Sequence, residues 1–415
     1  MNFYPLRDRL LAEVHARPST PIEAPMLVTR LAALSGVDGA EADRAHMALL
    51  CERLGQAGPT SGMRWWALDG GAWQLRWERH SEFSSWTLLQ RPSDEDENAP
   101  LSVLPADWLD AMPGPLLVFT RVRLRRGHHS QTAPEERQDV IGARLMGGAA
   151  TLLTDLRPDR HGMTHFDVVL HGDDPVLAGR LALMLLEIET YRMMALLAFP
   201  VAGSAAAQVA EMEAEVGTLA ARIAEAPGVE SDRALLAQLV ALSGRTEALS
   251  ASTTFRFGAG AAYHQIVHDR IDGLSEKPIP GLQTIETFME RRLAPAMRTC
   301  VSVAAREAAL LDRIARAGQM LNTRIELVTQ AINADLLASM DRRALAQLKL
   351  QRTVEGLSVA AIAYYVVSLL GYVFHGLGEF VPPFESPVAL AVAAPLVIAV
   401  IWLASRRLRR GLEGE

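Results

Sequence analysis

The chain has 415 residues, a hydrophobic content of 49% and a formal net charge of −7 at pH 7. This length allows two or three structural units, and the acidic balance argues against nonspecific binding to nucleic acid. The two cysteines, Cys51 and Cys300, do not indicate a disulfide framework or a cysteine zinc site. The first residues, MNFYPLRDRLLAEVHARP, are charged and lack an apolar segment. We therefore expect no signal peptide and a reducing, cytoplasmic setting.

Residues 1–200 carry the pattern of an α+β cytoplasmic domain. A short amphipathic helix is expected over 5–14 and another helix over 40–54, whereas the periodicity of 24–34 fits either a strand or a helix. Alternating, tryptophan-rich residues over 63–89 predict strands joined by a hairpin turn at Gly70-Gly71. Further strands are expected over 116–124, 150–156 and 165–170, and the last two would form a second hairpin.

Helical patterns dominate from residue 175. The apolar stretch 175–201 contains Arg180, Glu187, Glu189 and Arg192, which are too many charges for a free membrane span. We expect it to be a core helix beneath the sheet. A helical domain and stalk follow over 201–356, with two helices joined at 227–228, a third helical stretch over 255–271 and a proline-marked turn at 275–281.

One helix is predicted to be very long. No proline occurs between Pro295 and Pro382, and apolar residues recur every three or four positions from Leu310 to Leu336. A continuous helix of about 80 residues would measure roughly 120 Å at 1.5 Å per residue. We expect a stalk that continues into a membrane span, with Gly318 and Gly356 as its weak points.

Two uncharged segments, 357–377 and 388–405, are predicted to be transmembrane helices. About 20 apolar residues cross a bilayer core as a helix, and the alternative is a pair of buried core helices. The loop between them has Glu379 and Glu385 but no Lys or Arg, whereas basic residues flank both outer ends. Basic flanks stay in the cytoplasm. We therefore expect a multi-pass protein of the bacterial inner membrane with both termini in the cytoplasm.

The basic tail, residues 406–415, has two roles available. It sets the topology, and it can hold anionic lipid headgroups. The residues concerned are Arg406, Arg407, Arg409 and Arg410.

Polar residues follow one face of the first predicted span. They are Ser358, Tyr365, Ser368, Tyr372 and His375, at spacings of 7, 3, 4 and 3. Polar groups within a span face a partner helix or a water-filled path. The stripe therefore predicts either a pore lining built from several copies or a hydrogen-bonded seam between helices. Both interpretations favour a homo-oligomer or a tight hairpin.

Two patterns resemble metal sites. In an alternating strand, Glu78, His80 and Glu82 would share one face, where they could hold a divalent cation or form ordinary cross-strand ion pairs. His264 and His268 have the spacing of a zinc-binding helix. However, Gln265 occupies the place of the general base, so a polar surface or a subunit contact is the alternative.

Several strings together resemble a known family. They are PLRDRLLAEVHARP, RWERHSEF, FDVVLHGDDP, LLEIETYRMMALL and the stretch from LNTRIELVTQ to VAAIAYYV. The chain resembles, over nearly its whole length, a bacterial family of predicted membrane-anchored proteins, domain-of-unknown-function family 3422. The resemblance implies membrane anchoring but assigns no activity and no site residues.

The layout is also similar to that of the CorA-type magnesium channels. Those pentamers have an N-terminal α/β cytoplasmic domain, a stalk helix entering the first of two spans, a short outer loop and a basic tail. The CorA family carries Gly-Met-Asn at the outer end of the first span, where this chain reads YVFHGL over 372–377. The similarity is therefore one of layout and does not imply magnesium selectivity.

The leading functional hypothesis is an oligomeric inner-membrane protein that acts as an ion channel or transporter. The alternative is a membrane-anchored scaffold or tether that binds partners or lipid. We do not expect an enzyme; a third hypothesis is a metal-dependent enzyme using one of the two histidine patterns. The expected partners are the membrane and further copies of the chain, with no nucleic acid. A divalent cation is the one cofactor hypothesis.

Overall fold

The computed structural model describes residues 3–4, 7, 20–93, 101–127, 140–225, 229–378 and 387–412. Apart from Arg7, the helix expected over 5–14 lies outside these residues, as does the loop over 379–386. The chain divides into two compact units. The first comprises 1–226 and 235–318, and the second comprises 227–234 and 319–415.

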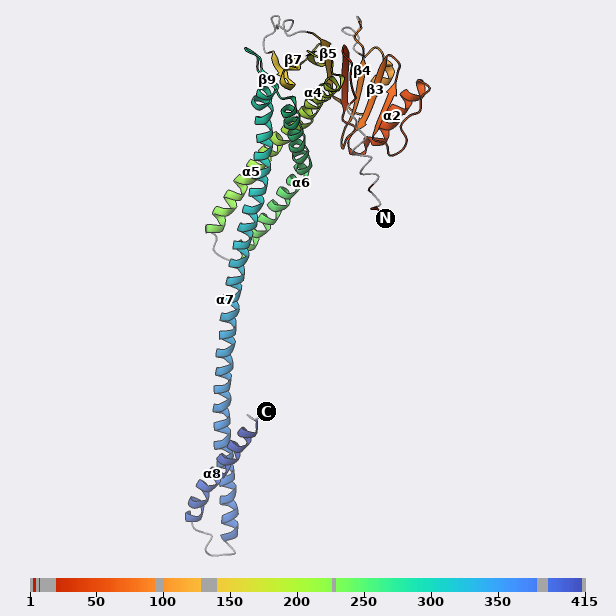
Figure 1. The fold of residues 1–415 in the computed structure, drawn as a ribbon. Helices are drawn as coiled ribbons and strands as arrows, with labels where there is room; N and C mark the ends of the chain where they lie inside the picture. Colours follow the sequence, from red (N-terminus) through yellow and green to blue (C-terminus); the bar gives the residue numbers. More distant parts are fainter. Residues whose placement is uncertain are drawn as a thin grey trace. The chain divides into compact units, whose positions relative to one another are not determined.

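The first unit is built on one mixed sheet of nine strands in the order β2-β3-β4-β1-β5-β8-β7-β6-β9 (Figure 1). All neighbouring strands are antiparallel except β5 and β8, which are parallel. The strands are β1 Met26–Ala33, β2 Trp65–Asp69, β3 Trp73–Arg79, β4 Ser84–Gln90, β5 Leu116–Arg126, β6 Ile141–Leu145, β7 Ala150–Pro158, β8 Thr164–Leu170 and β9 Lys277–Pro278.

The ambiguous segment 24–34 is a strand, β1, and it lies in the sheet between β4 and β5. Nearly all of β1 is buried, which explains why its sequence shows no clear alternation. Both predicted hairpins are confirmed. The first turns at Gly70-Gly71, where Gly71 has a φ of 82° and its N–H donates to Asp69 Oδ1 at 2.8 Å. Glycine tolerates this left-handed conformation.

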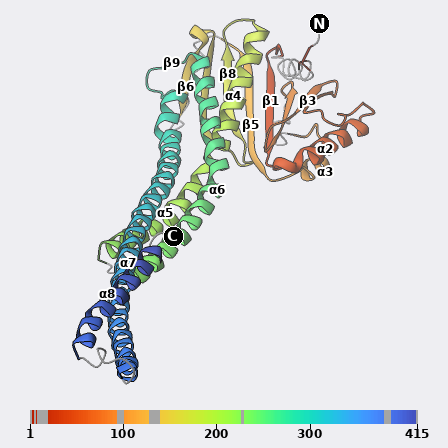
Figure 2. The ribbon, with the colours of Figure 1, turned by 90° about the horizontal axis from the view of Figure 1, so that it is seen from below.

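Helices cover both faces of the sheet (Figure 2). The helix α2 Ala40–Arg53 was expected, whereas the short α3 Ala106–Asp110 was not. Together they pack on one face around the buried Trp77, Trp86 and Trp108. The other face meets α4 Pro175–Leu196, whose N-cap Asp174 accepts hydrogen bonds from two backbone N–H groups. The prediction of a core helix beneath the sheet is thus confirmed.

The stretch over 73–90 corrects one sequence prediction. It was expected to be a single alternating strand, but β3 ends at Arg79 and β4 begins at Ser84. Between them the chain turns, and the N–H of His80 donates to the carbonyl of Phe83 at 2.9 Å. Alternation therefore ends at Arg79, and Glu82 does not share a strand face with Glu78.

Long helices follow the sheet. They are α5 Ala198–Glu225, α6 Val229–Leu274, α7 Ile285–Gly378 and α8 Pro387–Leu412. The helix α7 is continuous through Pro295, Gly318 and Gly356, so neither predicted weak point interrupts it. The turn expected over 275–281 contains β9, which pairs with β6 and brings the connection between α6 and α7 to the edge of the sheet.

Among the residues that the structure describes, two helical stretches are long and apolar enough to cross a membrane, namely Pro175–Glu225 and Ile285–Val373. Ala391–Ala404 is a shorter apolar stretch. Length and composition alone also admit the core helix of a soluble protein. In Pro175–Glu225, which begins with α4, 33% of the most apolar 18-residue segment is buried. In Ile285–Val373 the corresponding share is 6%.

Candidate functional site

A cavity of about 80 Å³ lies between α4 and the sheet face formed by β1, β3 and β4. Its floor contains a row of residues that are opposite one another on neighbouring strands. Arg30 on β1 is opposite Thr87 on β4, and Thr87 is opposite Arg76 on β3. The helix closes the other side with Gly179, Ala182, Leu183, Leu186, Glu187 and Tyr191.

Both arginines of this row are held by neutral side chains. Arg30 is 4% exposed, and its Nε donates to Thr87 Oγ1 at 3.0 Å. Arg76 donates from Nε and Nη2 to Gln74 Oε1, at 3.0 and 2.7 Å. Burial lowers the pKa of Arg76, and Arg30 adds to this effect, whereas Glu78 opposes it. The cavity floor is therefore rich in positive charge.

Two of the three predicted metal ligands on β3 and its turn reach this cavity. Glu78 and His80 both line it, and their Oε2 and Nε2 atoms are 3.9 Å apart. His80 also stacks on Phe83, with ring centroids 4.1 Å apart.

Glu82, the third residue, does not line the cavity and instead contacts α6. It is 5% exposed and forms an ion pair with Arg256 on α6, and Tyr263 donates to its Oε1 at 3.0 Å. Burial raises the pKa of Tyr263. These contacts join the turn after β3 to α6. Within the part of the chain that the structure describes, no group of three or more His, Cys, Asp or Glu side chains is placed to hold a metal ion.

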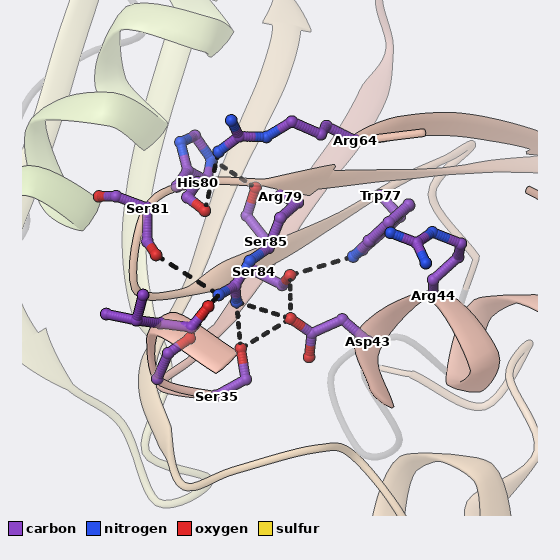
Figure 3. A network of polar contacts seen from close by, with 12 residues as sticks. Ser35, Asp43, Arg44, Arg64, Trp77, Arg79, His80, Ser81, Ser84 and Ser85 are labelled. Atoms are coloured by element: carbon purple, nitrogen blue, oxygen red, sulfur yellow. Dashed lines mark hydrogen bonds and ion pairs between the residues drawn. The ribbon is translucent and has the colours of Figure 1, made fainter. Parts of the chain in front are cut away.

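Figure 3 shows a second polar network on the opposite side of β3. Arg79 and Asp43 form an ion pair at 2.8 Å, and their side chains are 3% and 0% exposed. Ser35 and Ser84 donate to the same carboxylate oxygen at 2.7 and 2.6 Å, and Trp77 donates to the hydroxyl of Ser84 at 3.1 Å. This network joins α2 to the sheet through buried side chains, so we assign it a structural role.

The histidine pair on α6 lies against α7. The rings of His264 and His268 are 4.9 Å apart between centroids, and burial lowers the pKa of His264. They border a space of about 10 Å³ lined also by Glu286 and Glu290. This space is barely large enough for one water molecule, and the two histidines remain without a third ligand among the residues described.

The polar stripe on α7 is largely uncovered. Tyr365 and Tyr372 are 70% and 80% exposed, Ser358 and His375 are also exposed, and Ser368 is partly buried. Other positions of α7 lose exposure instead, with Ala363 buried and Val359 and Val367 partly buried. Most of the stripe is therefore exposed on α7.

In the basic tail, Arg407 is exposed. The side chains of Arg406, Arg409 and Arg410 lie outside what the structure describes.

Sequence reasoning missed Arg30, Thr87 and Arg76 as a group. They come from three strands, and only the pairing of β1 with β4 brings Arg30 beside the other two. One signal was present: an arginine within the largely apolar strand MLVTRLAA, where a charged side chain needs a specific partner.

Together, these observations define a protein with a mixed nine-stranded sheet domain followed by long helices. Among the residues described, two helical stretches are long and apolar enough to span a membrane. The chain belongs to the family described as "Protein of unknown function (DUF3422)", whose profile matches residues 2–412. No curated protein and no solved structure matches the chain.

Proposed function

We propose that this protein is an oligomeric ion channel or transporter of the bacterial inner membrane. In this proposal, α7 and α8 form a two-helix membrane hairpin, and both termini and the sheet domain are cytoplasmic. The observation that carries the proposal is the polar stripe of α7, most of which α8 leaves uncovered.

The stripe needs a partner if α7 enters a bilayer. Hydroxyl and imidazole groups facing lipid are unfavourable, so such groups face protein or water. Since Tyr365 and Tyr372 remain exposed, we expect a second copy of the chain to pack against them in the membrane. Copies arranged around a closed symmetry axis would bring their stripes together and line a common path.

The continuity of α7 supports the same arrangement. This single helix contains residues that pack in the sheet-bearing unit, such as Leu310 and Ile314, and also the predicted span over 357–377. Such a helix would transmit a change in one unit to the other without an intervening loop. Ion transport gated by the cytoplasmic domain would use this connection.

Ion flux into liposomes tests the proposal. Liposomes containing the full-length protein should take up monovalent or divalent cations, and Tyr372→Phe should change the rate about fivefold, as expected for losing a hydrogen bond of about 1 kcal/mol. Tyr364→Phe is the matched control, because Tyr364 is 71% exposed but lies outside the stripe. Absence of flux for every cation under all gating conditions, or equal effects of both variants, would contradict the proposal.

A membrane-anchored scaffold or tether is the second candidate. It is favoured by apolar side chains on α7 that lie outside the predicted span yet remain exposed, including Ile332, Leu336 and Met340. Exposed apolar surface of this kind marks sites of protein association. A scaffold would form the same oligomer and retain a stable partner, but its liposomes would conduct no cations.

A further inference from the structure

Among the residues described, the cavity beneath α4 is lined by two arginines but by only one carboxylate, that of Glu78, which is not paired with another arginine. Neither Arg30 nor Arg76 forms an ion pair with a carboxylate among the residues described, and their hydrogen-bond partners are the neutral Thr87 and Gln74. On the other face of the same sheet, the buried Arg79 has Asp43 as its partner. Burying a charge is unfavourable unless a counter-charge accompanies it.

The two guanidinium groups are placed to share one anion. Arg30, Thr87 and Arg76 are opposite one another on three adjacent strands and line the same cavity. Neighbouring strands are about 4.8 Å apart, so the backbones of the two arginines are roughly 10 Å apart. Arginine side chains are long enough for both guanidinium groups to reach one anion placed between them. The Thr87 hydroxyl accepts from Arg30 and can still donate its own proton to an anion.

The charge balance favours a monoanion. Among the acidic groups of the cavity, Glu187 is paired with Arg270, and Glu78 remains beside the two arginines. With the imidazole of His80 neutral, Arg30, Arg76 and Glu78 together therefore leave one net positive charge. A dianion such as a phosphate monoester would also meet repulsion from Glu78.

The lining divides the cavity into a polar and an apolar part. Val28 and Leu89 are opposite each other on β1 and β4, farther along the strands from His80 than the arginine row. Ile22, Leu183 and Leu186 add further apolar side chains to the lining. A ligand that fits this distribution has one charged end and a short aliphatic body. The volume of about 80 Å³ restricts it to a few non-hydrogen atoms.

We infer that this cavity binds a small organic carboxylate. The carboxylate lies between the guanidinium groups of Arg30 and Arg76 and accepts from the hydroxyl of Thr87. The aliphatic part packs against Val28 and Leu89. Arginine suits this role because its planar group can donate two parallel hydrogen bonds to a carboxylate. The site is independent of the membrane function proposed above.

Binding of butyrate to the full-length protein in a neutral detergent tests the site. Saturation-transfer NMR titrations should show binding of butyrate, and butyramide, its neutral analogue, should bind at least tenfold more weakly. Arg76→Met, at a partly exposed position, should weaken butyrate binding at least tenfold, as should Arg30→Met. Arg123→Met is the matched control, because Arg123 is on β5 of the same sheet but does not line the cavity.

Thermal unfolding of each variant separates loss of the site from loss of the fold. If Arg30→Met fails to fold, Arg76→Met still decides the question. Equal binding of butyrate and butyramide would overturn the inference, and so would unchanged butyrate affinity in folded Arg76→Met. Inorganic phosphate binding more tightly than butyrate would overturn the assignment to a carboxylate.

Discussion

At the scale of single residues, buried charges distinguish the two faces of the sheet. The face covered by α2 carries the closed Asp43–Arg79 pair, and the face covered by α4 carries two arginines beside a cavity. The first arrangement stabilises the fold, whereas the second leaves space for a ligand. The difference lies in whether a carboxylate of the chain itself fills the space beside the guanidinium group.

Asp43→Asn tests the structural role of the closed pair. The amide keeps the shape of the side chain but leaves the charge of Arg79 uncompensated, so we expect a loss of about 3–5 kcal/mol in the free energy of unfolding. Denaturant unfolding would measure it. Asp107→Asn is the control: its partner Arg53 is 46% exposed, so water screens the pair and the loss should be much smaller. Equal losses in the two variants would contradict this account.

Sequence patterns predicted residue positions well only where the local structure was regular. The alternation that grouped Glu78, His80 and Glu82 holds as far as Arg79 and ends at the turn, where the chain reverses. The direction of the Glu82 side chain depends on Arg256, which is 174 residues away in the chain. Period-two patterns carry no information about such distant partners, so this part of the site was not predictable.

At the scale of elements, a buried carboxylate lies between α6 and α7. Glu307 is 3% exposed, and its Oε2 accepts from the hydroxyl of Thr253 at 2.9 Å. Within the described part of the chain its Oε1 has no hydrogen-bond partner, and burial raises the pKa of this carboxyl group. We therefore expect the packing of these two helices to depend on pH.

Glu307→Gln tests this coupling. A raised pKa in the folded state contributes stability below the pKa of the unfolded chain, and that contribution is lost as the pH rises through the folded pKa. The glutamine variant should therefore exceed the wild type in Tm at pH 8, by roughly 2–4 °C. The gap should narrow as the pH falls toward about 4.3, the unperturbed pKa of glutamate.

Glu213→Gln is the control of opposite sign for that experiment. A hydrogen bond from Arg306 lowers the pKa of Glu213, so its contribution is present above the unfolded pKa and lost as the pH falls. This variant should lower the Tm at pH 8. A Glu307→Gln curve that runs parallel to the wild type from pH 5 to pH 8 would contradict the prediction.

Elements with strong periodicity were predicted from sequence, and weak edge elements were not. The positions of α2, α4 and the long α7 follow from apolar spacing, and the Gly70-Gly71 hairpin follows from turn chemistry. In contrast, β9 has only two residues in a segment that reads as a proline turn. It is a strand only because β6 lies beside it, and local sequence cannot reveal that neighbour.

At the scale of the whole molecule, exposed apolar side chains on α7 favour self-association of the chain. Leu321 is fully buried, and Arg324 forms an ion pair with Asp232 at the start of α6. Farther along the helix, Ile332 and Leu336 continue the same apolar stripe but are 58% and 57% exposed. If all copies enter one membrane in the same direction, this stripe meets its own counterpart in parallel. We therefore expect a second copy of the chain to pack against this stripe.

Glu substitutions on the stripe test whether it carries self-association. We expect Ile332→Glu to weaken association of the detergent-solubilised protein at least tenfold, because each copy would bury an unpaired charge in the contact. Leu337→Glu is the matched control. Leu337 is 66% exposed and lies about 100° around the helix from Leu336, off the stripe. Sedimentation equilibrium should show a smaller assembly for Ile332→Glu alone. Wild-type mass in both variants would place the contact between copies elsewhere, with the polar stripe over 358–375 as the remaining surface of α7 to test.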